Sequence, residues 1–168
     1  RRGLRFSLRL SPALPALLLV VFWWRRACVS PRRDVAPLLP FFALAAVFGA
    51  LTIWAERTLI GASGSGFEFS PLDRVLIAGR AVWFYLGRLL WPADLMFIYP
   101  RWTLDSSAWW QYLFPAALVL LLGALWALRS RSRAPLAALL YFCIALAPAL
   151  GCVNVYPFRF SFVADHFQ

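Results

Sequence analysis

Long apolar segments alternate along this chain with short connections that are rich in arginine. Four are predicted, and they run over about 10–24, 36–54, 111–128 and 135–153. A helix of about 20 apolar residues spans the roughly 30 Å of hydrocarbon in a bilayer. Backbone inside lipid must satisfy its own hydrogen bonds, so segments of this length predict helices. The pattern predicts an all-α, polytopic transmembrane helix bundle, with 1–168 forming part of one transmembrane domain.

The segment 74–91 has a different periodicity. On a helix with about 100° per residue, four polar side chains fall within one arc of about 120°. These are Asp73, Arg74, Arg80 and Arg88. The opposite side carries Val75, Leu76, Val82, Trp83, Leu86, Leu89 and Leu90. A single crossing here would place the two arginine-rich loops on opposite sides of the membrane. We therefore predict an extracytoplasmic interfacial amphipathic helix, with its basic face toward water or headgroups and its end at Trp91-Pro92.

Composition narrows the class of protein. Hydrophobic residues make up 62% of the chain and aromatic residues 17%, which is more apolar surface than a 168-residue soluble domain could bury. The net charge of +10 comes from arginines gathered between apolar segments, which argues against nucleic acid as a partner. The three cysteines form no CxxC or Cys/His cluster. The sequence therefore identifies no cofactor and no metal site, and it leaves metal dependence open.

The arginines also predict the orientation in the membrane. Short loops dense in arginine stay in the cytoplasm, which places 25–34 and 129–133 inside. The long connection 55–110 then lies outside, and its five acidic residues balance its five arginines. The arginines before residue 10 fit this scheme less well, because a fully spanning first segment would put them outside as well. We expect a multi-pass membrane protein with its long polar connection on the extracytoplasmic face.

Ionisable residues beside the outer ends of the predicted spans are candidates for a functional site. Arg159, Asp165 and His166 follow the last apolar segment, and Arg101 and Arg159 each lie in an aromatic-proline-arginine segment. A guanidinium presents a planar fork that matches phosphate oxygens, although simple snorkelling toward headgroups explains Arg159 equally well. Asp165 could orient an acceptor, bind a cation, pair with an arginine or cap a following helix. His166 could donate to a phosphate or shuttle a proton.

Three stretches of the chain resemble a known family. They are 85–92 (YLGRLLWP), 97–102 (FIYPRW) and 154–168 (NVYPFRFSFVADHFQ). They resemble bacterial multi-span proteins that carry C-terminal tetratricopeptide repeats, and these are similar to the transmembrane and tetratricopeptide-repeat protein O-mannosyltransferases of the GT-C glycosyltransferase superfamily. The resemblance implies a protein of the bacterial inner membrane. Its activity would be transfer of a sugar from a polyprenyl-phosphate-linked donor to a protein hydroxyl on the extracytoplasmic face.

The resemblance also implies roles for individual residues. Arg88, Arg101 and Arg159 would bind the donor phosphate, and Asp165 and His166 would be auxiliary to catalysis. The family's acidic catalytic motif lies in the first extracytoplasmic loop, and nothing in this sequence matches it. We therefore expect a fragment that lacks the N-terminal spans and the C-terminal repeats and is inactive alone. The implied partners are membrane lipid, the polyprenyl-phosphate sugar donor and an acceptor protein.

Two other classes of function fit parts of the same pattern. A non-catalytic membrane anchor or scaffold for tetratricopeptide repeats would explain the arginines by topology and the aromatic residues as interface anchors. A transporter is disfavoured, because no charged residue lies at the centre of a predicted span. An acidic pair in the first outer loop of a longer protein would favour sugar transfer over the anchor.

Overall fold

Helices make up the regular secondary structure of the part of the chain that the structure describes. This computed structural model describes residues 13–55, 58, 69–92, 96, 99–105, 107–147, 150 and 161–163. The longer helices are α1 (Leu14–Arg26), α2 (Leu39–Ala55), α3 (Pro71–Leu90), α4 (Leu113–Ala127) and α5 (Ala134–Leu146). Short helical turns are η1 (Pro31–Val35), η2 (Ala36–Leu38), η4 (Trp109–Tyr112) and η5 (Leu128–Ser130). The predicted all-α class is confirmed for these residues.

The predicted apolar segments correspond to helices whose ends are shifted. The first corresponds to α1 and the fourth to α5, and each of these helices has 13 residues. The second and third lie within two continuous helical stretches, Pro31–Ala55 and Trp109–Ser130, which are long and apolar enough to cross a membrane. Every residue of α2 and of α4 stays at least partly exposed. The apolar surfaces of these two helices are therefore left largely uncovered by the described part of the protein.

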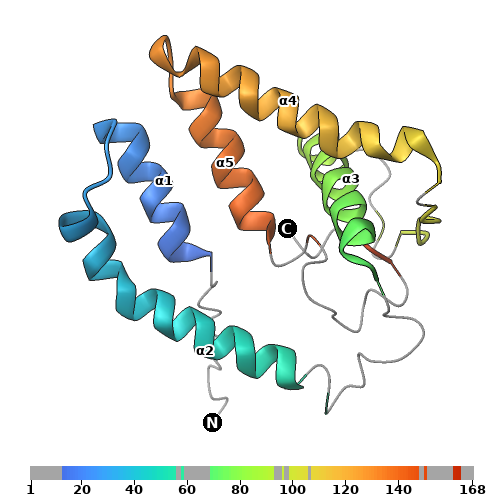
Figure 1. Cartoon of the computed structure of the whole chain (residues 1–168), viewed down its shortest axis with the longest axis horizontal. Helices are drawn as coiled ribbons and strands as arrows, with labels where there is room; N and C mark the ends of the chain where they lie inside the picture. The colour runs from blue at the N-terminus through green and yellow to red at the C-terminus, as the bar shows by residue number, and fades with distance from the viewer. Residues whose placement is uncertain are drawn as a thin grey trace.

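The arginine-rich loops lie at one end of the molecule. In Figure 1, α4 and α5 form a hairpin, α1 runs antiparallel to α5, and α2 extends away from them. The rings of Trp23 and Trp126 stack with centroids 6.3 Å apart and planes at 4°, which joins the end of α1 to the end of α4. Asp34 fixes the loop after α1, because it accepts hydrogen bonds from Arg26 and from the Ser30 backbone N–H, both at 2.8 Å.

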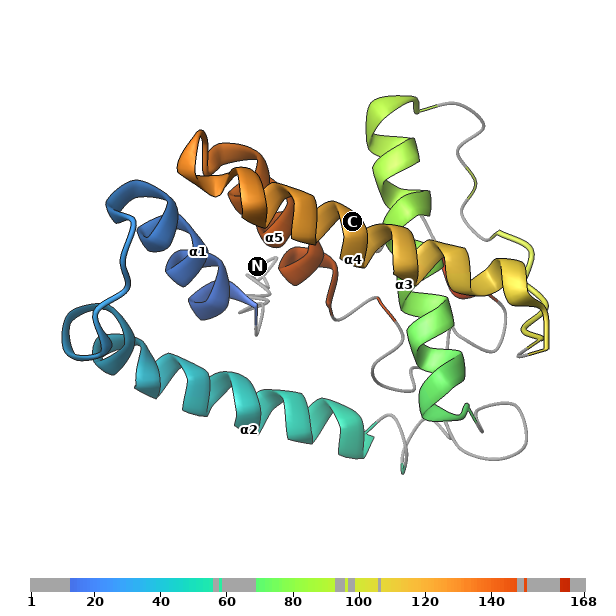
Figure 2. The same ribbon diagram turned by 45° about the horizontal axis from the view of Figure 1, so that its top comes forward.

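α3 is attached near the opposite end of α4, which it crosses steeply in Figure 2. A Cβ atom on Gly79 would lie 2.8 Å from Cδ of Pro115, so this close approach of the two helices depends on glycine. The indole N–H of Trp83 donates to the backbone carbonyl of Phe114 at 3.0 Å. These contacts hold α3 at the first turns of α4, away from the arginine-rich loops.

Local sequence explains where α3 begins and ends. Ser70 Oγ accepts a hydrogen bond from the Asp73 backbone N–H at 3.1 Å, and Asp73 Oδ2 accepts from the Ser70 backbone N–H at 2.9 Å. This capping box satisfies two of the donors that a helix start leaves unpaired, and Pro71 suits the first helical position. Trp91, which precedes Pro92, has extended backbone. The predicted end of this helix is confirmed, and its start lies earlier than predicted.

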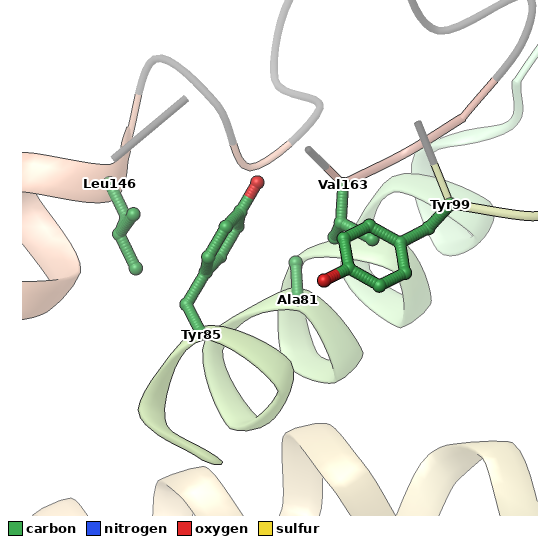
Figure 3. Packing of buried hydrophobic residues seen from close by; sticks show 5 residues of the cluster. All are labelled: Ala81, Tyr85, Tyr99, Leu146 and Val163. Atoms are coloured by element: carbon green, nitrogen blue, oxygen red, sulfur yellow. The ribbon is translucent and has the colours of Figure 1, made fainter. Parts of the chain in front are cut away.

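The hydrophobic core gathers around α3. Buried residues are found on every side of this helix, namely Leu76, Ile77, Gly79, Ala81, Val82 and Tyr85. Figure 3 shows Ala81 and Tyr85 packed with Tyr99, Val163 and Leu146, the last residue of α5. Segments far apart in the sequence therefore converge on α3. This differs from a helix with one basic face open to water, because residues 99–105 and 161–163 cover much of the side that carries the arginines.

Candidate functional site

Arg80 lies in a cage of three aromatic rings on the side of α3 that meets residues 99–105. Its guanidinium carbon is 4.4 Å from the ring centroid of Trp102, 5.7 Å from that of Trp110 and 5.8 Å from that of Phe114. Burial lowers the pKa of Arg80 from its ordinary value, but a guanidinium remains charged at neutral pH. Among the described residues, none pairs with Arg80 by hydrogen bond or ion pair. Within the part of the chain that the structure describes, the faces of these rings are therefore what stabilises its positive charge.

Arg88 and Arg101, which were predicted to bind phosphate, also lie over aromatic rings. The guanidinium carbon of Arg88 is 5.3 Å from the ring centroid of Tyr99 and 5.4 Å from that of Phe84. The guanidinium carbon of Arg101 is 5.0 Å from the ring centroid of Phe162 and 5.5 Å from that of Phe69. A ring covers the flat face of a guanidinium, whereas the N–H groups lie in its plane, where phosphate oxygens bind. Aromatic rings therefore hold each of these guanidiniums by a face.

The other predicted site residues cannot be placed in the same way. Arg159, Asp165 and His166 lie outside the described residues, so their roles stay predictions. The chain between Arg159 and Asp165 is described at 161–163, where all three residues are buried. Phe162 packs edge-to-face on Phe69 with centroids 5.5 Å apart. The second aromatic-proline-arginine segment is therefore followed directly by residues that pack beside Arg101.

An open hollow of about 450 Å³ lies beside Arg101. Its lining residues are Phe69, Asp73, Arg101, Trp102, Thr103, Leu104 and Phe162. It combines a guanidinium, a carboxylate and a hydroxyl with aromatic rings. In ligand sites of this composition, the apolar surface contacts the ligand and a few polar groups fix the ligand's orientation. Of the two described arginines in the prediction, only Arg101 lines this hollow, and Arg88 contacts a different pair of rings.

Asp73 is the carboxylate of the hollow, and the sequence-based prediction did not include it among the site residues. Its Oδ2 accepts hydrogen bonds from the backbone N–H and the hydroxyl of Ser70, at 2.9 and 2.8 Å. Its Oδ1 has no hydrogen-bond partner among the described residues. The Ser-x-x-Asp spacing before an apolar run is the signal that could have identified this fixed carboxylate. One oxygen therefore holds the helix start, and the other can accept a hydrogen bond from a ligand.

This arrangement suits a ligand that carries an anionic group beside a ring with hydroxyl substituents. A fixed guanidinium stabilises phosphate charge without any proton transfer. The indole of Trp102 offers an apolar surface, and the free oxygen of Asp73 and the hydroxyl of Thr103 can bond to hydroxyl groups. No group of three or more His, Cys, Asp or Glu side chains that could hold a metal ion occurs in the described ranges.

Comparison with known proteins adds no family to this description. No family model, no curated protein and no solved structure matches the chain.

Proposed function

We propose that this chain is part of a multi-pass glycosyltransferase of the bacterial inner membrane. It would transfer a sugar from a polyprenyl-phosphate-linked donor to a protein hydroxyl on the extracytoplasmic face. The observation that supports the proposal is the hollow in which Arg101, Asp73 and Trp102 come together. A lipid-linked sugar phosphate carries the groups that these side chains recognise, namely a phosphate, hydroxyl groups and an apolar ring face.

The exposed apolar helices support a membrane location. The stretch Trp109–Ser130 has 22 residues, and at about 1.5 Å per residue it is roughly 33 Å long, close to the thickness of the hydrocarbon. Leaving large side chains such as Val119 and Leu120 exposed in water would cost free energy on every turn of α4. Lipid around α2 and α4 removes this cost. The proposal therefore treats both helices as membrane spans.

The two ends of α4 support the proposed sidedness. The loops after α1 and after α4 lie together at one end, where their arginines would mark the cytoplasm. α3 and the hollow beside Arg101 are attached near the other end, next to the aromatic residues Trp109 and Trp110. Tryptophan gathers at membrane–water interfaces. The hollow would thus open at the level of the outer headgroups, where the phosphate of a polyprenyl donor resides.

In the proposed reaction, the bond between the anomeric carbon and the phosphate oxygen breaks, and its electron pair stays on the leaving polyprenyl phosphate. The hydroxyl oxygen of the acceptor protein forms the new bond to the anomeric carbon, and its proton passes to water or to the leaving phosphate. Arg101 would neutralise the leaving phosphate, which gains charge as the bond breaks. Asp73 and Trp102 would hold the sugar in place by hydrogen bonding and by contact with its apolar face.

The test is substitution of Arg101 in the full-length protein in its own membranes. Arg101→Ala is expected to reduce transfer of the sugar to the acceptor protein at least about a hundredfold, because one charge-stabilising group at a reacting phosphate is worth roughly that much. Arg131→Ala is the matched control, since it removes the same charge from an exposed position at the other end of α4. Equal transfer by wild type and Arg101→Ala would contradict the proposal and favour the non-catalytic anchor.

A further inference from the structure

A second hollow lies at the arginine-rich end of the molecule. It has a volume of about 360 Å³, and its lining residues are Trp23, Ala27, Ala127, Arg129, Ser130 and Arg133. Two of these residues belong to the end of α1, and the others belong to the end of α4 and the turn into α5. Figure 1 shows these two parts of the chain at the same end, away from α3. The hollow is therefore separate from the one beside Arg101.

The electrostatics of this second hollow favour an anion. Arg129 and Arg133 line it, and none of its described lining residues is acidic. Asp34, the carboxylate of the loop after α1, already accepts hydrogen bonds from Arg26 and Ser30. Among the described residues, Arg133 has no hydrogen-bond or ion-pair partner for its guanidinium. Two positive charges thus meet in one hollow, and none of the described residues that line it carries a negative charge to balance them.

Arg129 is held in a fixed position. Its Nη1 donates to the Trp126 carbonyl oxygen at 2.9 Å, and its guanidinium carbon is 4.3 Å from the centroid of the Trp126 ring. That ring in turn stacks on Trp23. One hydrogen bond occupies one of the five N–H groups of a guanidinium, so most of the donors of Arg129 remain for a ligand. The stack therefore fixes the donor and also supplies an apolar wall.

We propose that this hollow binds the phosphate headgroup of an anionic phospholipid from the leaflet on the arginine-rich side. The two guanidiniums and the hydroxyl of Ser130 would hold the phosphate oxygens. A basic hollow between membrane helices, at the cytoplasmic end, is a typical place for such headgroups. The apolar walls at Trp23, Ala27 and Ala127 suit the glycerol and the first carbons of the acyl chains. Free phosphate would bind the same two guanidiniums and hydroxyl but would leave these apolar walls uncovered.

Binding at this place would have a structural consequence. The lining residues come from both sides of the Trp23–Trp126 stack, so a bound headgroup would join α1 to the α4–α5 hairpin. The proposal rests on the membrane location that the proposed function also assumes, but it does not depend on sugar transfer. Loss of lipid binding and loss of transfer can be measured separately, because they involve arginines at opposite ends of α4.

The experiment measures lipid binding to the full chain in zwitterionic detergent by native mass spectrometry and by thermal unfolding. Phosphatidylglycerol is expected to remain bound and to raise the Tm, whereas phosphatidylcholine is not. Arg133→Ala should weaken phosphatidylglycerol binding about tenfold, as expected for the loss of one charge-assisted contact, and Arg129→Gln should do the same. The guanidinium of Arg133 makes no hydrogen bond or ion pair with the described residues, and the backbone bond from Ala137 remains in Arg133→Ala, so the substitution should leave the lipid-free Tm unchanged.

The control is Arg131→Ala, which removes the same charge from the same loop at an exposed position that does not line the hollow. It should bind phosphatidylglycerol within about twofold of wild type. An equal loss in Arg131→Ala and Arg133→Ala would show that only net charge matters and would overturn the proposal. Equal binding of phosphatidylcholine would also overturn it. Displacement of the lipid by millimolar inorganic phosphate would identify free phosphate as the ligand instead.

Discussion

The two ends of α4 both carry arginines, but the arginines are held in different ways. At the end near α3, Arg80, Arg88 and Arg101 each lie over at least two aromatic rings. Arg101 is exposed, as are Arg25, Arg32, Arg33 and Arg131 at the other end, but these four lie over no aromatic ring of the described residues. An arginine away from aromatic rings keeps its hydration, whereas a ring-packed arginine gives up part of it, and the ring face compensates for the loss. The density of arginines in a loop therefore indicates which side of the membrane the loop faces. Contact between an arginine and aromatic rings indicates the candidate site.

The largest expected effect comes from separating α3 from α4. Gly79→Ala should destabilise the fold by about 1–3 kcal/mol, because the added Cβ meets backbone atoms of Pro115 that cannot move independently. The measurement is the free energy of unfolding in mixed detergent micelles. Gly87→Ala is the matched control on the same helix, since nothing lies within 4 Å of its added Cβ. If both variants unfold at the same denaturant concentration, the helices do not cross as described.

A smaller effect is expected at the arginine-rich end. Trp23→Ala should lower the free energy of unfolding by about 1 kcal/mol more than Trp24→Ala does, because of these two residues Trp23 is the one that stacks on Trp126. Trp24 is the neighbouring tryptophan and is 47% exposed. The comparison uses the same unfolding measurement on both variants. A larger loss for Trp24→Ala would mean that the ends of α1 and α4 are not joined by this stack.

The smallest effect concerns a hydrogen bond in the loop before α4. The hydroxyl and the backbone N–H of Ser107 donate to Asp105 Oδ1, at 2.6 and 2.9 Å, and they hold the pKa of Asp105 below its ordinary value. The stabilisation is therefore present above the unfolded-state pKa of the carboxyl, and it is lost as the pH falls through the folded-state pKa. Ser107→Ala should raise the pKa of Asp105 part of the way back, because the backbone donor remains.

The check is an NMR titration of the carboxyl carbon of Asp105 across acidic pH. Ser132→Ala, which is exposed in the loop at the other end of α4, serves as the control and should leave the pKa of Asp105 unchanged. An unchanged pKa in Ser107→Ala would contradict the hydrogen bond from the hydroxyl.

The sequence predicted the helices better than their contacts. Hydropathy located the apolar helices, and Trp91-Pro92 located the end of α3. Periodicity describes only one helix at a time, so it assigned the basic arc of α3 to water or headgroups. The rings that cage Arg80 include Trp110 and Phe114, which lie about 30 residues later in the chain. No local pattern connects them to Arg80.

The sequence predicted only part of the candidate site, because the residues of the hollow come from segments that no local pattern connects. Arg101 was identified from its aromatic-proline-arginine segment, and the structure places it in a hollow. Periodicity places Asp73 only in the polar arc of the predicted helix, whereas its Ser-x-x-Asp spacing is the signal of a fixed carboxylate. Asp73 and Arg101 line the same hollow because residues 99–105 lie beside the start of α3. Trp102 and Leu104 pack with Phe69 and Phe162 there, and sequence periodicity does not describe such long-range contacts.

The most direct test of the account is whether the two ends of α4 lie on opposite faces of a membrane. Cys28 is an exposed free thiol at the arginine-rich end, and Thr103 lines the hollow beside Arg101. Cells would carry either Cys28 or Thr103→Cys as the single thiol, with Cys143 and Cys152 replaced by alanine. A membrane-impermeant thiol reagent added outside should label Thr103→Cys, and Cys28 should react only after permeabilisation. Labelling of both thiols from the same side would contradict the proposed membrane placement.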